Sequence, residues 1–519
     1  MNCRKLIRHI LIYGSGVWAG KAIGFIMIPF YTRALSPADY GVLELASRTT
    51  DIIAMILALG LAAALIRFHA EAKTDEDRER VIRTAVVFAG IVGLAAAGVL
   101  AISAGLVSDL VFGTGRYTLV VRLALIGMGL ELGTMVPMAL LRLQERSALF
   151  TAVNLGRLMV ALGLNIYLVV LRRMGVVGVF TSNLVGVSLV LVVLFAATRR
   201  YWRPSIDLDV LKRMTAYSLP LVPSSLAMFV LNFGDRYFLR SCWGLKTLGV
   251  YALGYKLCLV MPGMIMEPLG LAWSAVMFEV ANRDDANRVY ARYFNGYMFC
   301  VVFFSVLIAA LSRDLVKVMA APGYGEAWRI VPVVLLGFIA WSSVNVFEIG
   351  ALIEKKTYYR TLSCVTAGAV ALAAYALLIP RWAGMGAAWA TVLGFAAMSA
   401  TSYVFSRKLR AIPYDMKRAA ILVSLGAITY GATVLVPGVG VVSALGRACV
   451  VAMFPVLLYA VGYFEPENIA AVLGKRRAES REQRAERAEQ PSYPSSEAEV
   501  GRPSHPPSEA EGVRGRSDS

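Results

Sequence analysis

Ionisable side chains within apolar stretches are the residues of this 519-residue chain that carry chemistry. Four cations lie deep in such stretches, at Lys21, Arg48, Arg157 and Lys256. Charged groups at membrane depth are costly, so they normally face protein or a water-filled cavity. An ammonium or guanidinium group in a water-poor cavity binds phosphate well, and arginine does so through two parallel hydrogen bonds. These positions therefore predict a site for an anion, with phosphate the favoured kind.

Carboxylates accompany these cations along the same predicted helices. Because a helix turns about 100° per residue, Glu44, Arg48 and Asp51 share one face. Lys256 and Glu267, eleven positions apart, also share a face. Two interpretations remain open at this point. Either the polar faces line a wet central cavity, or the charges pair with one another and pin the helices together.

A third polar face carries an aromatic ring, an amide and a carboxylate, at Trp341, Asn345 and Glu348. The four acids on these faces, Glu44, Asp51, Glu267 and Glu348, have two open roles. They either balance the charge of the neighbouring cations or couple the movement of an ion.

The composition requires that these side chains be positioned by helices in a membrane. Hydrophobic residues make up 58% of the chain and charged residues 17%, with a mean hydropathy of +0.63. Soluble domains carry about 25% charged and 45–50% apolar residues, so a water-soluble enzyme is excluded. The six cysteines form no CxxC pair, and three histidines offer little for a metal site. We expect no metal, no other cofactor and no catalytic residue.

Apolar runs of the roughly 20 residues needed to cross a bilayer recur with short gaps. They predict an all-α polytopic membrane protein of about fourteen transmembrane helices. The spans lie near residues 9–31, 42–66, 84–108, 118–141, 149–171, 175–197, 216–234, 247–275, 293–312, 329–353, 361–380, 384–405, 419–437 and 441–463.

The distribution of positive charge predicts the orientation and excludes nucleic acid as the partner. The net charge of +18 lies wholly in the apolar part, since the tail from Lys475 to Ser519 has 9 basic and 9 acidic residues. Alternate loops, counted from the N-terminus, hold 26 Lys and Arg, and the remaining loops hold 10. Cytoplasmic loops are the basic ones, so both termini should be cytoplasmic.

An internal repeat divides the predicted spans into two similar bundles. Residues 29–42 read PFYTRALSPADYGV and residues 236–250 read RYFLRSCWGLKTLGV, which aligns Arg33 with Arg240 and Gly41 with Gly249. Parallel repeats of this kind occur in transporters whose halves rock about a central site. The predicted units are a six-helix bundle at 1–205, a second at 206–412, two additional helices at 413–464 and a cytoplasmic disordered tail at 465–519.

Three segments carry a resemblance to a known family. They read YGSGVWAGKAIGFIMIPFYTRALSPADYGVLELAS at residues 13–47, LGLAAALIRFHAE at 59–71 and GDRYFL at 234–239. On these segments the chain resembles the polysaccharide biosynthesis (oligosaccharide flippase) family of the multidrug/oligosaccharidyl-lipid/polysaccharide exporter superfamily. The resemblance covers nearly all of the membrane part, and the tail beyond residue 475 has no typical counterpart.

The resemblance implies a function and assigns the polar residues to it. It implies two bundles around a cationic cavity that moves a polyprenyl-diphosphate-linked oligosaccharide across the bacterial cytoplasmic (inner) membrane. A polysaccharide polymerase and chain-length machinery are candidate partners. The expected diphosphate ligands are Lys21, Arg48, Arg157 and Lys256, the residues near the two mouths are Arg67 and Arg236, and the sugar contacts are Trp341 and Asn345.

Two other functions remain as alternatives. A cation-coupled drug antiporter of the same superfold predicts a cavity dominated by carboxylates, whereas the polar faces here are mixed or basic. A membrane enzyme that polymerises or ligates the glycan needs a catalytic extracytoplasmic loop. The longest predicted outer loop, from about Ser312 to Trp328, is short for that purpose.

Overall fold

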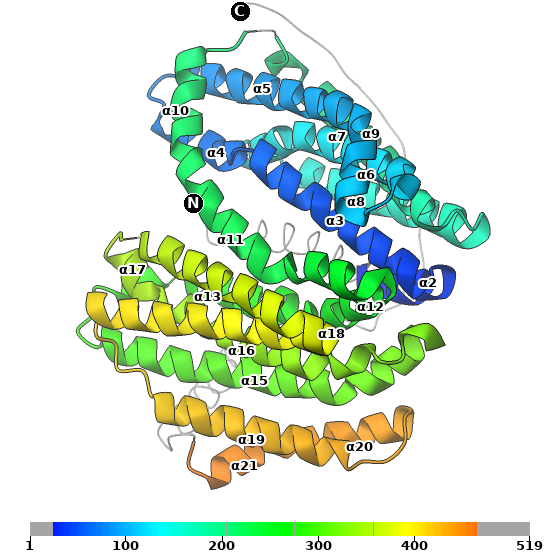
Figure 1. The fold of residues 1–519 in the computed structure, drawn as a ribbon. Coiled ribbons are helices and arrows are strands. Elements are labelled where there is room, and N and C mark those ends of the chain that lie inside the picture. The colour runs from blue at the N-terminus through cyan, green and yellow to red at the C-terminus, as the bar shows by residue number, and fades with distance from the viewer. Residues whose placement is uncertain (1–23, 204, 275, 357, 464–519) are drawn as a thin grey trace, which may run out of the picture. The chain divides into compact units, whose positions relative to one another are not determined.

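The computed structural model describes residues 24–203, 205–274, 276–356 and 358–463 (Figure 1). Every regular element within these ranges is a helix, which confirms the all-α prediction. The first 23 residues, including Lys21, and the predicted tail at 465–519 lie outside the described residues.

In the N-terminal part, α7 is the helix around which the others pack. It lies between α5 and α9, and it also contacts α3, α4, α6 and α8. The helices are α2 (Ile28–Ala34), α3 (Pro37–Leu57), α4 (Leu61–Glu71), α5 (Asp75–Ile102), α6 (Ala104–Phe112), α7 (Thr118–Leu143), α8 (Ser147–Asn165) and α9 (Gly175–Thr198).

In the C-terminal part, α18 packs against α11, α12 and α16, while α15 carries α19 and α20. The helices are α10 (Leu208–Ser218), α11 (Val222–Phe233), α12 (Asp235–Cys258), α13 (Glu267–Ser274), α14 (Met277–Val280), α15 (Ala286–Met319), α16 (Val331–Phe347), α17 (Ile349–Ile353), α18 (Tyr358–Leu409), α19 (Met416–Val434), α20 (Val441–Ala452) and α21 (Phe454–Ala460).

Ten helical segments of the described residues are long and apolar enough to cross a membrane, so the protein is a multi-pass membrane protein. Two of them, Val222–Ser274 and Tyr358–Leu409, are 53 and 52 residues long. An unbroken helix of that length would extend about 78 Å, more than twice the bilayer core. The second is broken at Ala383, where φ is 49° and ψ is −128°. The exact number of fourteen crossings stays a prediction.

Local sequence determines where α3, the helix with three of the predicted polar residues, begins and ends. Ser36 and Asp39 cap its first turn reciprocally, and Pro37 occupies the first helical position. The helix ends before Leu59 and Gly60, whose φ angles of 46° and 62° break the helical path. The face with Glu44 and Asp51 is thereby held in register with the helices around it.

The two glycines that the sequence repeat aligns meet at one helix crossing, where α3 lies beside α12 (Figure 1). A Cβ on Gly41 would collide with the carbonyl oxygen of Leu245, and a Cβ on Gly249 would collide with that of Pro37. Each glycine thus packs on the carbonyl four residues before the other. Two hydrogen bonds close the same end: Thr32 Oγ1 donates to Met319 O at 3.0 Å, and Tyr324 Oη donates to Leu35 O at 3.0 Å.

Replacing Gly41 with alanine should force α3 and α12 apart, because the new methyl group has no space against the Leu245 carbonyl. Overpacking of this kind costs about 1–3 kcal/mol, and we expect Gly41→Ala to lower the free energy of unfolding by that amount. Gly98→Ala is the control, since a Cβ there meets nothing within 4 Å. Equal stability of the two variants in SDS denaturation would show that the crossing tolerates a side chain.

Candidate functional site

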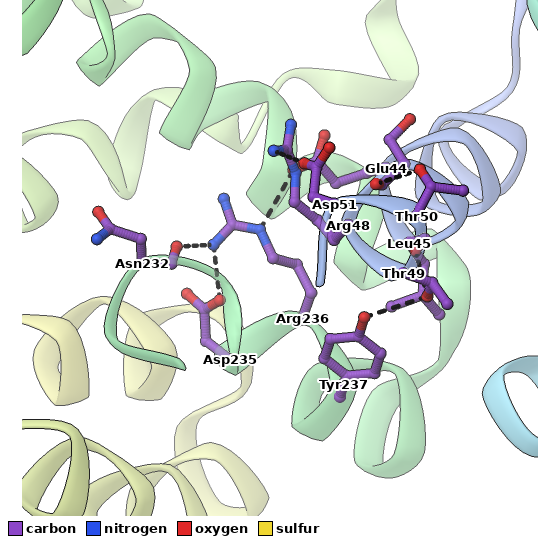
Figure 2. A network of polar contacts seen from close by, with 11 residues as sticks. Glu44, Leu45, Arg48, Thr49, Thr50, Asp51, Asn232, Asp235, Arg236 and Tyr237 are labelled. Atoms are coloured by element: carbon purple, nitrogen blue, oxygen red, sulfur yellow. Dashed lines mark hydrogen bonds and ion pairs between the residues drawn. The ribbon is translucent and has the colours of Figure 1, made fainter. Parts of the chain in front are cut away.

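A network of charges joins α3 to the junction of α11 and α12, with Arg236 at its centre (Figure 2). The Arg236 guanidinium, 1% exposed, contacts Asp235 Oδ1 at 2.6 Å and Glu44 Oε1 at 3.3 Å, and donates to the Asn232 carbonyl at 2.7 Å. The ring of Tyr255 lies 4.2 Å from the guanidinium carbon. The network therefore buries a fully compensated cation between the two parts of the chain.

Arg48 extends this network along α3. Its Nε donates to Glu44 Oε1 at 3.0 Å, and its NH1 group donates to Asp51 Oδ2 at 2.5 Å. The guanidinium also lies over the ring of Phe233, 4.3 Å from the centroid. The predicted face of Glu44, Arg48 and Asp51 thus exists, and its members pair with one another.

Lys256 lies close to the network but is not part of it. Its charge acts on Glu44 and Arg48, yet among the described residues it makes no ion pair. Its Nζ is 5.9 Å from the ring centroid of Tyr31. Lys256 lines a cavity of about 580 Å³ with Glu267 and with apolar residues of two segments, 24–26 and 259–264. We call this the Lys256 cavity.

Arg157 belongs to a second group of polar residues, on α7, α8 and α9. Its NH1 group contacts Glu131 Oε1 at 2.8 Å, and its NH2 group donates to Asn183 Oδ1 at 3.3 Å. Glu131, Asn183 and Asp51 line a separate cavity of about 560 Å³ between α3, α7, α9 and α11. We call this the α3–α7 cavity.

The other predicted residues lie elsewhere in the fold. Arg67 pairs with Glu71 at 2.8 Å and stacks on Tyr217, and both members of the ion pair are half-exposed. Arg236, expected near a mouth of the cavity, is instead buried at the centre of the network. A cation in that position fastens helices and is screened from an entering ligand.

The predicted sugar contacts and their neighbouring acid share one helical segment. The ring of Trp341 stacks on Phe395 with 5.3 Å between centroids, and exposed Asn345 donates to Tyr297 Oη at 3.3 Å. Glu348 is 7% exposed and pairs through Oε2 with Arg360 at 3.2 Å. Among the described residues, no hydrogen bond or ion pair joins these three residues to the charge network. The structure therefore joins the face of Glu44, Arg48 and Asp51 to Arg236, and it leaves the face of Trp341, Asn345 and Glu348 with other partners.

A family model described as "Polysaccharide biosynthesis protein" matches residues 6–281 of this chain. The matched region spans more than half of the sequence and contains both the charge network and Lys256. The chain belongs to this polysaccharide biosynthesis protein family. It matches no curated protein sequence.

Solved structures show that this family member has the fold of flippases and transporters. A lipid II flippase, MurJ, in an inward closed conformation, has a TM-score of 0.69 at 12% identity, covering 87% of this chain and 99% of that chain. An inward-facing MATE multidrug resistance transporter of the MOP superfamily has a TM-score of 0.53 at 15% identity, covering 80% and 95%. A MOP superfamily transporter from Pyrococcus furiosus has a TM-score of 0.52 at 15% identity, covering 80% and 96%. None of these three is an enzyme.

Sequence reasoning did not assign a role to Asp235, Glu131 or Asn183 of this family member. Asp235 directly precedes Arg236, and an acid beside a base in an apolar stretch was the signal for a buried pair. Asn183 follows Thr181 and Ser182 in an otherwise apolar run, and nothing in the sequence says which neighbouring helix it faces. Its partner, Arg157, comes from a different helix.

Removing the Arg236 guanidinium should destabilise the protein, because Asp235 is wholly buried and would lose its cation. Breaking a buried pair by deleting one partner costs about 3–5 kcal/mol, and we expect Arg236→Met to lower the free energy of unfolding by that amount. The double variant Asp235→Asn/Arg236→Met should recover most of it, because the buried Asp235 charge is removed together with its cation and Glu44 still contacts Arg48.

Denaturation in SDS measures these differences, with Arg240→Met as the control on the same helix. Arg240 makes no ion pair with any described residue. Unchanged stability of Arg236→Met, or a double variant less stable than the single one, would contradict the role of the network.

Proposed function

We propose that this protein flips a polyprenyl-diphosphate-linked oligosaccharide across the bacterial cytoplasmic membrane by alternating access, for cell-surface polysaccharide biosynthesis. The observation that carries the proposal is the Lys256 cavity, where a lysine with no ion pair among the described residues stands in a largely apolar lining, in a member of a polysaccharide biosynthesis family. A lipid diphosphate combines the two properties that this lining recognises, a concentrated negative charge and a hydrocarbon chain.

The charge of Lys256 lowers the cost of moving a diphosphate through a hydrocarbon layer of about 30 Å. An ammonium group binds phosphate as a point charge and does not impose a fixed geometry. The apolar wall formed by Leu259, Val260 and Met264 suits the first units of the polyprenyl chain. We propose Lys256 and Lys21 as the diphosphate ligands, and Arg48 and Arg157, each paired with carboxylates, as supporting cations.

Alternating access requires that one end of the path close while the other is open. In this structure the beginning of α3 is closed on α12 by the Gly41–Gly249 crossing and by the Arg236 network. The α3–α7 cavity lies beyond this closure, along the part of α3 from Ser47 to Ala58. We propose that the closed end faces the outside of the cell, because both termini are proposed to be cytoplasmic.

The cargo would pass to enzymes that extend or attach the glycan, so a polysaccharide polymerase and chain-length machinery are the proposed partners. Products of the lipopolysaccharide O-antigen or exopolysaccharide type fit this placement. A drug antiporter would need carboxylates available to a cation, but Asp51 and Glu131 are each engaged by an arginine.

Lys256→Ala should slow the flipping of a fluorescent lipid-linked oligosaccharide by about tenfold, which corresponds to about 1.4 kcal/mol of lost charge stabilisation. The measurement is flipping in proteoliposomes. Lys246→Ala is the matched control, since Lys246 lies on the same helix, is exposed and lines neither cavity. Equal rates for wild type and Lys256→Ala would remove Lys256 from the path, and elongation of the glycan would favour an enzyme.

A further inference from the structure

The second cavity suggests where the glycan lies. We propose that the α3–α7 cavity binds uncharged sugar residues of the cargo headgroup while the diphosphate is held at Lys256. This inference rests on the proposed flippase function and adds a binding site for the hydroxyl-rich part of the cargo. The volume of about 560 Å³ is within the 300–1,000 Å³ that ligand sites usually have.

Two exposed carboxylates in the lining favour a hydrated cavity. Asp51 lies within the 21-residue helix α3 and Glu131 near the middle of the 26-residue helix α7. Their side chains are nevertheless 49% and 43% exposed, and both line the cavity. A carboxylate at that depth is costly against lipid but stable against water. The accessible surface at these positions therefore belongs to a wet chamber.

The ion pairs in this chamber leave hydrogen-bond acceptors on both carboxylates. Asp51 contacts Arg48 through Oδ2, and Glu131 contacts Arg157 through Oε1. A carboxylate has about four lone-pair positions on its two oxygens, so most of them remain available. Glu131 has Arg157 as its partner, and Asp51 shares Arg48 with Glu44. Hydroxyl groups, which donate hydrogen bonds, match the acceptors that remain on these oxygens.

The remaining lining provides a donor and an apolar wall. Asn183 accepts from Arg157 through Oδ1, and its amide nitrogen has no partner among the described residues. Met55, Met128 and Phe180 form an apolar surface in the same cavity. A sugar ring presents hydroxyl groups at its edge and C–H groups on its faces. The lining offers a partner to both kinds of surface.

The positions along α3 order the two parts of the headgroup. Glu44 is close enough to Lys256 for their charges to interact, and Asp51, seven residues further on, lines the α3–α7 cavity. Seven residues of helix advance about 10 Å. A diphosphate at Lys256, near Glu44, and sugars near Asp51 would therefore lie about two turns apart along α3, with Arg48 between them.

The test compares two lipid probes in proteoliposomes. One is polyprenyl diphosphate carrying a fluorescent oligosaccharide, and the other is polyprenyl diphosphate without sugar, whose flipping is followed by its accessibility to added phosphatase. We expect Asn183→Ala to slow the first probe about tenfold, the effect of losing one or two hydrogen bonds, and to leave the second within about twofold. Met55→Trp, which fills the cavity, should show the same selectivity more strongly.

The matched control is Asn154→Ala on neighbouring α8, because the Asn154 amide donates to the Phe150 carbonyl of its own helix and does not line the cavity. Equal slowing of both probes by Asn183→Ala and Met55→Trp would indicate a structural defect and overturn the sugar site. Unchanged rates for both probes would overturn it as well. If wild type moves the oligosaccharide probe, the proposed function survives either result; if wild type moves neither probe, both proposals fail.

Discussion

A guanidinium that is 1% exposed inside a membrane-spanning helix must be compensated on every side, and the arrangement of α3, α11 and α12 provides this compensation for Arg236. Asp235, Glu44 and the Asn232 carbonyl supply oxygens, and Tyr255 supplies a ring face. Because Glu44 comes from α3, the two parts of the chain cannot separate at this end without exposing an unpaired charge. The network thereby fastens α3 to the junction of α11 and α12.

The same network separates two chemical environments. Arg48 and Arg236 both contact Glu44, and Lys256 nearby makes no ion pair within the part of the chain that the structure describes. On the other side, Arg48 also contacts Asp51, which lines the α3–α7 cavity. One face of α3 thus runs from Glu44, on the side of Lys256, to Asp51 in the α3–α7 cavity.

The sequence was sufficient for the helices and for contacts within one helix. Hydropathy identified the apolar segments, and helical periodicity placed Glu44, Arg48 and Asp51 on one face, where they pair. Periodicity cannot say which helices are neighbours, because pairing between helices depends on packing. The partnership of Arg157 with Asn183 and the burial of Arg236 therefore had no basis in spacing. The fourteen crossings and the two-bundle division remain predictions.

The two glycines that the sequence repeat aligns, Gly41 and Gly249, form the crossing of α3 and α12. Each packs on the backbone carbonyl four positions before the other glycine: Gly41 on Leu245, and Gly249 on Pro37. The crossing is therefore built from two reciprocal contacts, and glycine allows the two backbones to touch. The Arg236 network beside it supplies directional bonds that the glycines lack. The contact between α3 and α12 at this end therefore combines close backbone packing, which depends on the two glycines, with ion pairs, which depend on Arg236.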